Sequence, residues 1–97
     1  PNADHTSIQQ ALNYIHMHYY ESLTLQELSD VVHLNTSYFS SLFKQSIGLN
    51  FLQYLTAYRI KEAKKLLLDS PYSIEEISMR VGYKTSKYFI QIFKEYE

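Results

Sequence analysis

An internal repeat is the feature of this sequence that most constrains its fold. The segment SYFSSLFK at residues 37–44 returns as KYFIQIFK at residues 87–94, in the shared frame Tyr-Phe-x-x-(Leu/Ile)-Phe-Lys. The segments before these copies also match, because Glu27, Ser29 and Val32 meet identical residues at an offset of 49. The offset then grows to 50, so the second copy has one more residue in its turn. One supersecondary unit is therefore used twice.

Each copy has the pattern of a short helix, a tight turn and a second helix. Thr24 and Ser73 each stand three residues before a glutamate, which is the spacing of a capping box. Asn35 and Thr85 can cap the second helix of each copy. Gly48 can end the first of these second helices, because glycine tolerates the left-handed conformation that a helix end commonly needs. This order of elements is the anatomy of a helix-turn-helix.

The rest of the sequence also favours helices. Apolar residues recur at helical spacing over residues 7–20, where Thr6 or Ser7 can cap the first turn. A long amphipathic stretch covers residues 51–69, and Pro71 ends it because proline disfavours helix for the residue before it. We expect an all-α fold of six or seven helices without strands, with two helix-turn-helix subdomains joined by a long central helix.

Composition and charge exclude several kinds of protein. The 97 residues include no cysteine, which removes disulfides, zinc fingers and thiol catalysis. No apolar run approaches the roughly 18–20 residues of a membrane span. Net charge is −1, yet residues 1–43 contain no lysine or arginine, and all nine basic residues lie from Lys44 onward. The chain begins at Pro1 without a signal-peptide pattern, and we expect it to be part of a longer protein.

The outer side of each second helix suits DNA. In a DNA-binding helix-turn-helix, exposed residues near the start of the second helix meet base edges in the major groove. Serine and glutamine can hydrogen-bond these edges, and isoleucine can touch a thymine methyl group. The candidates for base contacts are Thr36, Ser37, Ser40, Ser41, Ser86, Lys87, Ile90 and Gln91.

Phosphate contacts are expected around the same helices. Unpaired N–H groups at each helix start are good phosphate partners, and the Tyr38 and Tyr88 rings can pack while their hydroxyls reach a phosphate. The candidates for phosphate contacts are Asn35, Tyr38, Lys44, Lys61, Lys64, Lys65, Lys84, Thr85, Tyr88 and Lys94. Because residues 1–43 lack cations, the second unit and the central helix are expected to supply most of the neutralising charge.

A second interpretation stays open on these grounds. Helix-turn-helix pairs also serve as plain packing units, so the chain can equally be an interaction module that holds RNA polymerase or another regulator without reading DNA. A 19-residue helix at about 1.5 Å per residue spans roughly 28 Å. Successive major grooves on one side of DNA repeat every ~34 Å, which is compatible with two-groove docking without requiring it.

Other chemistry finds no support in the sequence. His16 and His18 point away from each other on a helix, and neither His5 nor His33 belongs to a metal-ligand spacing in the sequence. No nucleophile–base pair, catalytic carboxylate pair or Gly-rich phosphate loop is present, so we expect no metal, no cofactor and no enzymatic activity. His33 falls where the second copy has Gly82, and we expect it to shape the turn.

Arg59 in YRIKEAKKLL has two interpretations. It can contact phosphate, or it can pair with an acidic residue such as Glu27 or Glu76, and we favour the structural role. Most of the ten tyrosines and five phenylalanines fall on the core sides of helices, so packing is a better account of them than base stacking.

Five segments, in order along the chain, carry a family resemblance. They are LTLQELSDVV (23–32), YFSSLFK (38–44), Gly48 with F..YL...RI..A..LL (51–67), IEEISMRVGY (74–83) and YF...FK (88–94). Together they resemble the C-terminal DNA-binding domain of the AraC/XylS family of bacterial transcription regulators, over residues 8–96.

The resemblance implies one AraC-type domain over residues 1–97. Within it, the first helix-turn-helix subdomain covers 8–48, the linker helix 51–69, and a C-terminally truncated second subdomain 72–97. It implies sequence-specific binding of double-stranded DNA in two consecutive major grooves, most often to activate transcription. The family often has arginine at Ser41 and Gln91, so strong arginine–guanine contacts are not expected.

The resemblance also implies partners. These are the DNA of a promoter operator, RNA polymerase, and an N-terminal effector or receiver domain of the same chain. No membrane is involved, the setting is the cytoplasm, and the isolated domain is expected to be a monomer.

Overall fold

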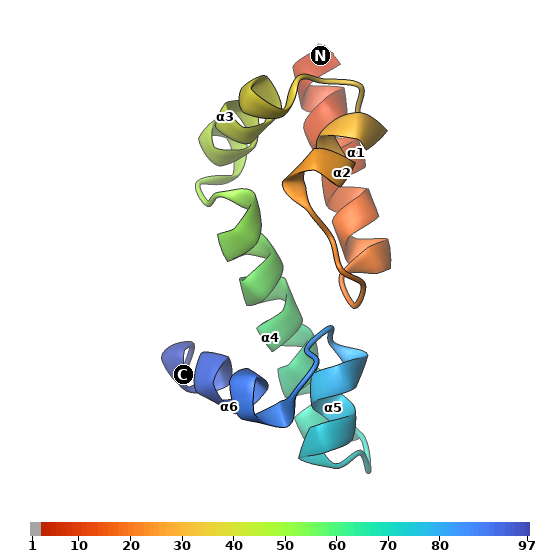
Figure 1. The fold of residues 1–97 in the computed structure, drawn as a ribbon, viewed down its shortest axis with the longest axis vertical. Helices are drawn as coiled ribbons and strands as arrows, with labels where there is room; N and C mark the ends of the chain where they lie inside the picture. Colours follow the sequence, from red (N-terminus) through yellow and green to blue (C-terminus); the bar gives the residue numbers. More distant parts are fainter. Residues whose placement is uncertain (1–2) are drawn as a thin grey trace. The chain divides into compact units, whose positions relative to one another are not determined.

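The computed structural model describes residues 3–97 and folds them into six α-helices (Figure 1). No strand occurs among these described residues, which confirms the predicted fold class. The helices are α1 Ala3–His18, α2 Leu25–Val31, α3 Thr36–Ile47, α4 Phe51–Asp69, α5 Ile74–Arg80 and α6 Ser86–Glu95.

The chain divides into two compact units, each with its own core. The first comprises the described residues through His18 together with Leu23–Leu55, and the second comprises Tyr19–Ser22 together with Thr56–Glu97. The helix α4 contributes residues to both units. The first unit contains the helix-turn-helix α2–α3, and the second contains α5–α6.

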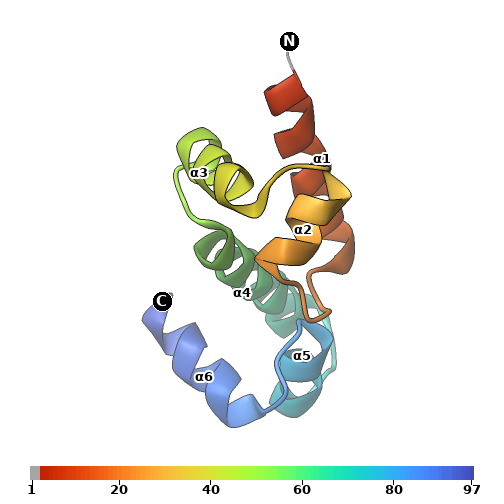
Figure 2. The same cartoon turned by 45° about the horizontal axis from the view of Figure 1, so that its top comes forward.

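Phenylalanines of α3 form the centre of the first unit. Phe39 and Phe43 are fully buried, and their ring centroids lie 5.8 Å apart. The helix α1 packs against both α2 and α3, and Figure 2 shows it beside α2. It begins at Ala3, so Thr6 and Ser7 lie inside the helix and the prediction that one of them caps it is wrong. No glycine or proline in residues 3–6 stops the helix from extending there.

The second unit has a matching core around Phe89 of α6. The helix α4 contributes Ile60 and Ala63 to this core, α5 contributes Ile77, and the C-cap of α5 contributes Val81. Each of these side chains is at most 2% exposed. The frame that the two copies share therefore places its first phenylalanine, Phe39 or Phe89, in the core of each unit.

The two helix-turn-helix turns both use a left-handed residue. Gly82 has φ 108° in the second turn, and His33 has φ 60° in the first. The prediction that His33 shapes the turn is confirmed. A residue with a Cβ rarely adopts a positive φ, so the first turn holds a conformation that costs histidine more than glycine.

All four predicted N-caps of the repeat are formed. Thr24, Asn35, Ser73 and Thr85 each accept a hydrogen bond from the backbone N–H three residues later. Gly48 ends α3 with φ 90°. The four caps fix where the helices of both helix-turn-helix units begin.

The reciprocal half of the capping box differs between the copies. It forms at α5, where the Ser73 backbone N–H donates to Glu76 Oε1 over 3.1 Å. At α2 it does not, because Glu27 Oε2 accepts from the Tyr14 hydroxyl over 2.9 Å instead. A carboxylate of the predicted box thus ties α2 to α1.

Arg59 anchors a loop within the second unit. Its Nε donates to the carbonyl oxygen of Tyr19 and its Nη2 to that of Glu21, both over 2.7 Å. The expected pairing with a carboxylate such as Glu27 or Glu76 is therefore wrong. The guanidinium also lies 5.3 Å from the ring centroid of Tyr83. Burial lowers the pKa of Arg59 from its ordinary value.

Candidate nucleic-acid interface

The outer side of α3 presents a row of small polar side chains and one lysine. Ser37, Ser41 and Lys44 are exposed and follow one another at spacings of four and three residues, so they share one side of the helix. Phe39 and Phe43 fix the opposite side in the core. The row is free to meet another molecule.

Thr36, at the start of the same helix, is engaged inside the unit. Its Oγ1 donates to Gln26 Oε1 over 3.0 Å and lies 2.9 Å from the Ser29 hydroxyl. Gln26 in turn donates to Asp30 over 3.0 Å. These bonds tie the first turn of α3 to α2, and Thr36 can reach a base only by giving up part of this network.

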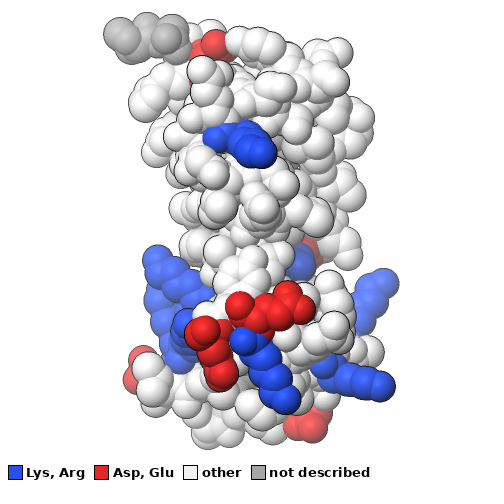
Figure 3. Space-filling view, turned by 90° about the vertical axis from the view of Figure 1, so that its left-hand side faces the viewer, with Lys and Arg blue, Asp and Glu red and all other residues white. Residues whose placement is uncertain are grey.

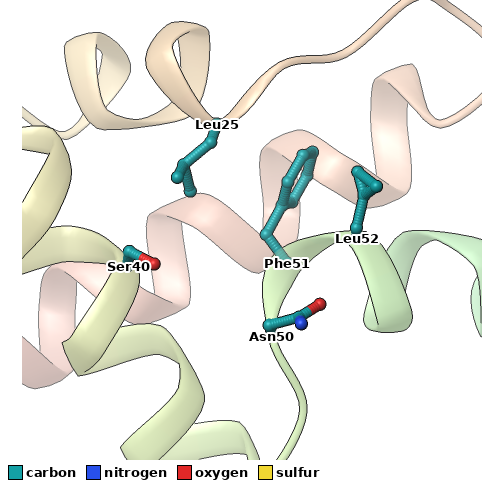
Figure 4. Close-up of a pocket in the computed structure, with 5 residues that line it drawn as sticks. All are labelled: Leu25, Ser40, Asn50, Phe51 and Leu52. Carbon is teal, nitrogen blue, oxygen red and sulfur yellow. The ribbon is translucent and has the colours of Figure 1, made fainter.

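Ser40 lies at the edge of the outer row. It is half-buried and lines a hollow of about 240 Å³ whose other walls come from α2 and the start of α4. Figure 4 shows its hydroxyl pointing into this hollow. The lining residues are Leu25, Ser40, Asn50, Phe51 and Leu52.

The Tyr38 hydroxyl has a partner that sequence analysis did not predict. It donates to Asp4 Oδ2 over 2.7 Å, across 34 residues of sequence, while the side chain stays 48% exposed. The hydrogen bond to Asp4 raises the pKa of Tyr38 above its ordinary value. A carboxylate therefore stands beside a predicted phosphate contact.

The outer side of α6 carries more varied side chains than that of α3. Lys87, Tyr88, Ile90, Gln91 and Lys94 are exposed, and only Ser86 among the predicted contacts of this helix is half-buried. The Tyr88 ring packs on Tyr83 at 5.8 Å between centroids. Both lysines and the glutamine have chains long enough to reach into a groove.

The second helix of each helix-turn-helix, α3 or α6, is called its recognition helix, and the N-caps of both use their side-chain oxygens for hydrogen bonds within the unit. Asn35 Oδ1 accepts from the Tyr38 backbone N–H over 3.1 Å, and Thr85 Oγ1 accepts from the Tyr88 N–H over 3.2 Å. Both residues are exposed. A phosphate contact by the Asn35 side chain therefore uses its amide N–H₂.

The lysines of α4 interact within their own unit. Lys65 pairs with Glu62 over 3.0 Å, and hydrogen bonding to that carboxylate raises the pKa of Lys65. Lys61 lies 6.0 Å from the Tyr58 ring centroid and Lys64 6.0 Å from that of Phe93. All three lysines remain exposed, as does the fourth predicted cation of this region, Lys84.

Charge is unequally divided between the units. The first carries a single lysine, Lys44, against Asp4, Glu27 and Asp30. The second carries eight lysines and arginines against seven carboxylates. Figure 3 shows the corresponding concentration of blue side chains in one unit. Electrostatic attraction to a polyanion is thus concentrated in the second unit.

Two contributors to the interface escaped the sequence analysis. Asp4 precedes the stretch expected to be helical and meets Tyr38 only through tertiary packing. Gln26 lies on α2, the first helix of its helix-turn-helix, where no base contact is expected, yet it holds Thr36. The one sequence signal that draws attention to Gln26 is its place in the repeat, where it corresponds to Glu75 at the offset of 49.

Neither a cluster of metal ligands nor a membrane-spanning helix occurs in the described part of the chain. No cluster of three or more histidines or carboxylates suited to a metal ion occurs in residues 3–97. Within the same residues, no helix is both long and apolar enough to cross a bilayer.

Comparisons with known sequences identify relatives over the whole chain. A family model described as a helix-turn-helix domain matches residues 28–97. The chain is 35% identical over 97 residues to YtdP, an HTH-type transcriptional regulator of Bacillus subtilis, covering 99% of this chain and 13% of that protein. It spans 31% and 30% of the length of two further curated relatives. The chain thus corresponds to less than a third of each.

Solved structures share the fold. The C-terminal domain of AraT, a response regulator from Geobacillus stearothermophilus, superposes with a TM-score of 0.88 at 36% identity, over 92% of this chain and 74% of that one. The DNA-binding domain of AdpA, solved in complex with a target DNA, gives a TM-score of 0.86 at 23% identity, over 91% and 79% of the two chains.

Proposed function

The chain belongs to the AraC-type helix-turn-helix domains of transcriptional regulators, and on that premise we propose that it binds double-stranded DNA sequence-specifically through α3 and α6. One observation carries the proposal. The repeated unit buries Phe39 and Phe43 in the first copy and Phe89 in the second, and it leaves a row of exposed side chains on the second helix of each copy. The AdpA domain, which has the same fold, was solved on DNA.

The proposed division of labour follows from side-chain exposure. Ser37 and Ser41 on α3, and Lys87, Ile90 and Gln91 on α6, are placed to meet base edges without breaking an internal bond. Thr36, Ser40 and Ser86 are half-buried and act at the edge of each contact. The docking of the two helices in consecutive major grooves is part of the proposal.

Phosphate contacts are proposed to come mainly from the second unit. Lys84, Lys87 and Lys94 flank α6, and Lys61, Lys64 and Lys65 lie on α4. Lys44 alone supplies a cation to the first unit. The exposed hydroxyls of Tyr38 and Tyr88, and the helix starts at Asn35 and Thr85, complete the set.

The whole protein is proposed to be a larger regulator that acts in the cytoplasm at promoters. An N-terminal effector or receiver domain would supply the signal, and contact with RNA polymerase would make activation the outcome. The isolated chain is proposed to be a monomer that binds without catalysis. Linking it to a second copy through the rest of the protein would raise avidity.

A low-salt fluorescence-anisotropy titration against a random duplex pool, followed by selection and sequencing of the bound fraction, tests this function. We expect a motif of two blocks about one helical turn apart. A bound pool that stays random, with an affinity that salt hardly changes, would overturn the proposal. Such a result would favour the module that contacts RNA polymerase or another regulator without reading DNA.

A further inference from the structure

We propose that Asp4 restrains DNA binding by the first unit, because its carboxylate holds the Tyr38 hydroxyl that a DNA phosphate would otherwise bind. This inference rests on the proposed function and adds a residue that sets the affinity. It assigns to α1 a role beyond packing.

The geometry places the carboxylate directly on the contact. Tyr38 lies in the first turn of α3, and its hydroxyl donates to Asp4 Oδ2 over 2.7 Å. The Tyr38 side chain is nearly half exposed, so this hydroxyl is at the surface of the recognition helix. A hydroxyl has one proton to donate, so it can serve Asp4 or a phosphate but not both.

Electrostatics strengthens the competition. A phosphate that approached Tyr38 while Asp4 stayed in place would bring two negative charges within a few ångströms. In water such repulsion is worth roughly a factor of four in an equilibrium constant. The first unit has only Lys44 to offset it, against three carboxylates. DNA binding therefore requires Asp4 to move away from the Tyr38 hydroxyl, or it takes place without a phosphate contact from Tyr38.

The second unit supplies an internal comparison. Tyr88 occupies the position of Tyr38 in the repeat, is similarly exposed, and packs its ring on Tyr83. Within residues 3–97, no carboxylate accepts from its hydroxyl. The restraint is thus a property of the first unit, imposed by a residue outside the repeated pattern.

The test is Asp4→Ala, which removes both the charge and the acceptor, in the 97-residue chain, titrated by anisotropy against a mixed-sequence 30-base-pair duplex at low salt. Phosphate contacts do not depend on sequence, so this probe works whether or not a specific motif exists. We expect affinity to rise about threefold to tenfold and the salt slope to steepen by up to about 0.9. Circular dichroism of the variant checks that the gain is measured on a folded chain.

Two controls decide the interpretation. Asp69→Ala makes the same substitution at an exposed site in the second unit and should change affinity less than Asp4→Ala does. In a Tyr38→Phe background, the gain from Asp4→Ala should shrink to the level of Asp69→Ala. Equal gains from the two Ala variants, or an undiminished gain without the Tyr38 hydroxyl, would overturn the inference. Neither result would touch sequence specificity, which the selection experiment tests separately.

Discussion

The two helix-turn-helix units repeat one sequence pattern, yet they secure it differently. The first has His33 at φ 60° in its turn. Its Glu27 accepts a hydrogen bond from Tyr14 on α1, and its Thr36 donates one to Gln26 on α2. The second uses Gly82 at φ 108° and a complete capping box. The first unit is therefore held by contacts between its helices, and the second more by local backbone geometry.

The same contrast extends to what the units offer DNA. The first presents small hydroxyl side chains and a tyrosine already bonded to Asp4. The second presents lysines, a glutamine and an exposed isoleucine. A shared scaffold can thus carry two chemically different recognition helices, because the pattern that fixes the core leaves the outer side unconstrained.

The largest expected effect on stability comes from removing a buried phenylalanine ring from either core. Phe39→Ala and Phe89→Ala each remove a ring that is at most 2% exposed, and each should lower the free energy of unfolding by about 3–5 kcal/mol. Urea denaturation followed by circular dichroism measures both. A loss in one variant that is much smaller than in the other would show that the two cores are not equivalent.

The turns should respond in opposite directions to a change at matching positions. Gly82→Ala should cost about 2 kcal/mol or more, because its Cβ would lie 2.8 Å from Arg59 Nε at a φ that alanine avoids. His33→Gly should be neutral or stabilising within about 1 kcal/mol, since glycine accepts the positive φ. Thermal melting compares them, and destabilisation by His33→Gly would contradict the account of the first turn.

The charge difference should appear in DNA binding. Lys84→Ala with Lys87→Ala should lower affinity about tenfold and reduce the salt slope by up to about 1.8, because two phosphate neutralisations are lost. Lys44→Ala should reduce the slope by half as much or less. Anisotropy titrations over a salt series measure both. Unchanged affinity and slope in the double variant would refute the dominance of the second unit.

The smallest expected effect concerns the capping box. Hydrogen bonds from Ser73 lower the pKa of Glu76, so its stabilising contribution is present above its ordinary pKa and is lost as pH falls through the lowered value. Glu76→Gln should remove this part of the acid dependence. Melting temperatures between pH 6 and pH 3 provide the measurement. If the two proteins lost stability in parallel, the box would not be contributing.

Local features of the fold could be predicted from the sequence. The caps Thr24, Asn35, Ser73 and Thr85 and the helix end at Gly48 are confirmed, because each depends on residues within a few positions. The expectation that most phenylalanines fall on the core sides of helices also holds for Phe39, Phe43 and Phe89, which are buried. These features follow from short-range backbone hydrogen bonding and from helical periodicity.

Contacts across long sequence separations could not be predicted in the same way. The acceptors of Arg59 are backbone carbonyls, which every residue has, so no residue type marks them. The bond from Tyr38 to Asp4 crosses 34 residues and exists only because α1 packs on α3. The base and phosphate contacts stay predictions, since they depend on where DNA lies.

The most direct measurement is to repeat the selection from random duplexes with two variants, Ser41→Ala on α3 and Gln91→Ala on α6. If each unit reads its own block, Gln91→Ala will relax base preference in one block and Ser41→Ala, more weakly, in the other. If both variants select the motif of the unaltered chain, or both change the same block, the two recognition helices do not read DNA as proposed.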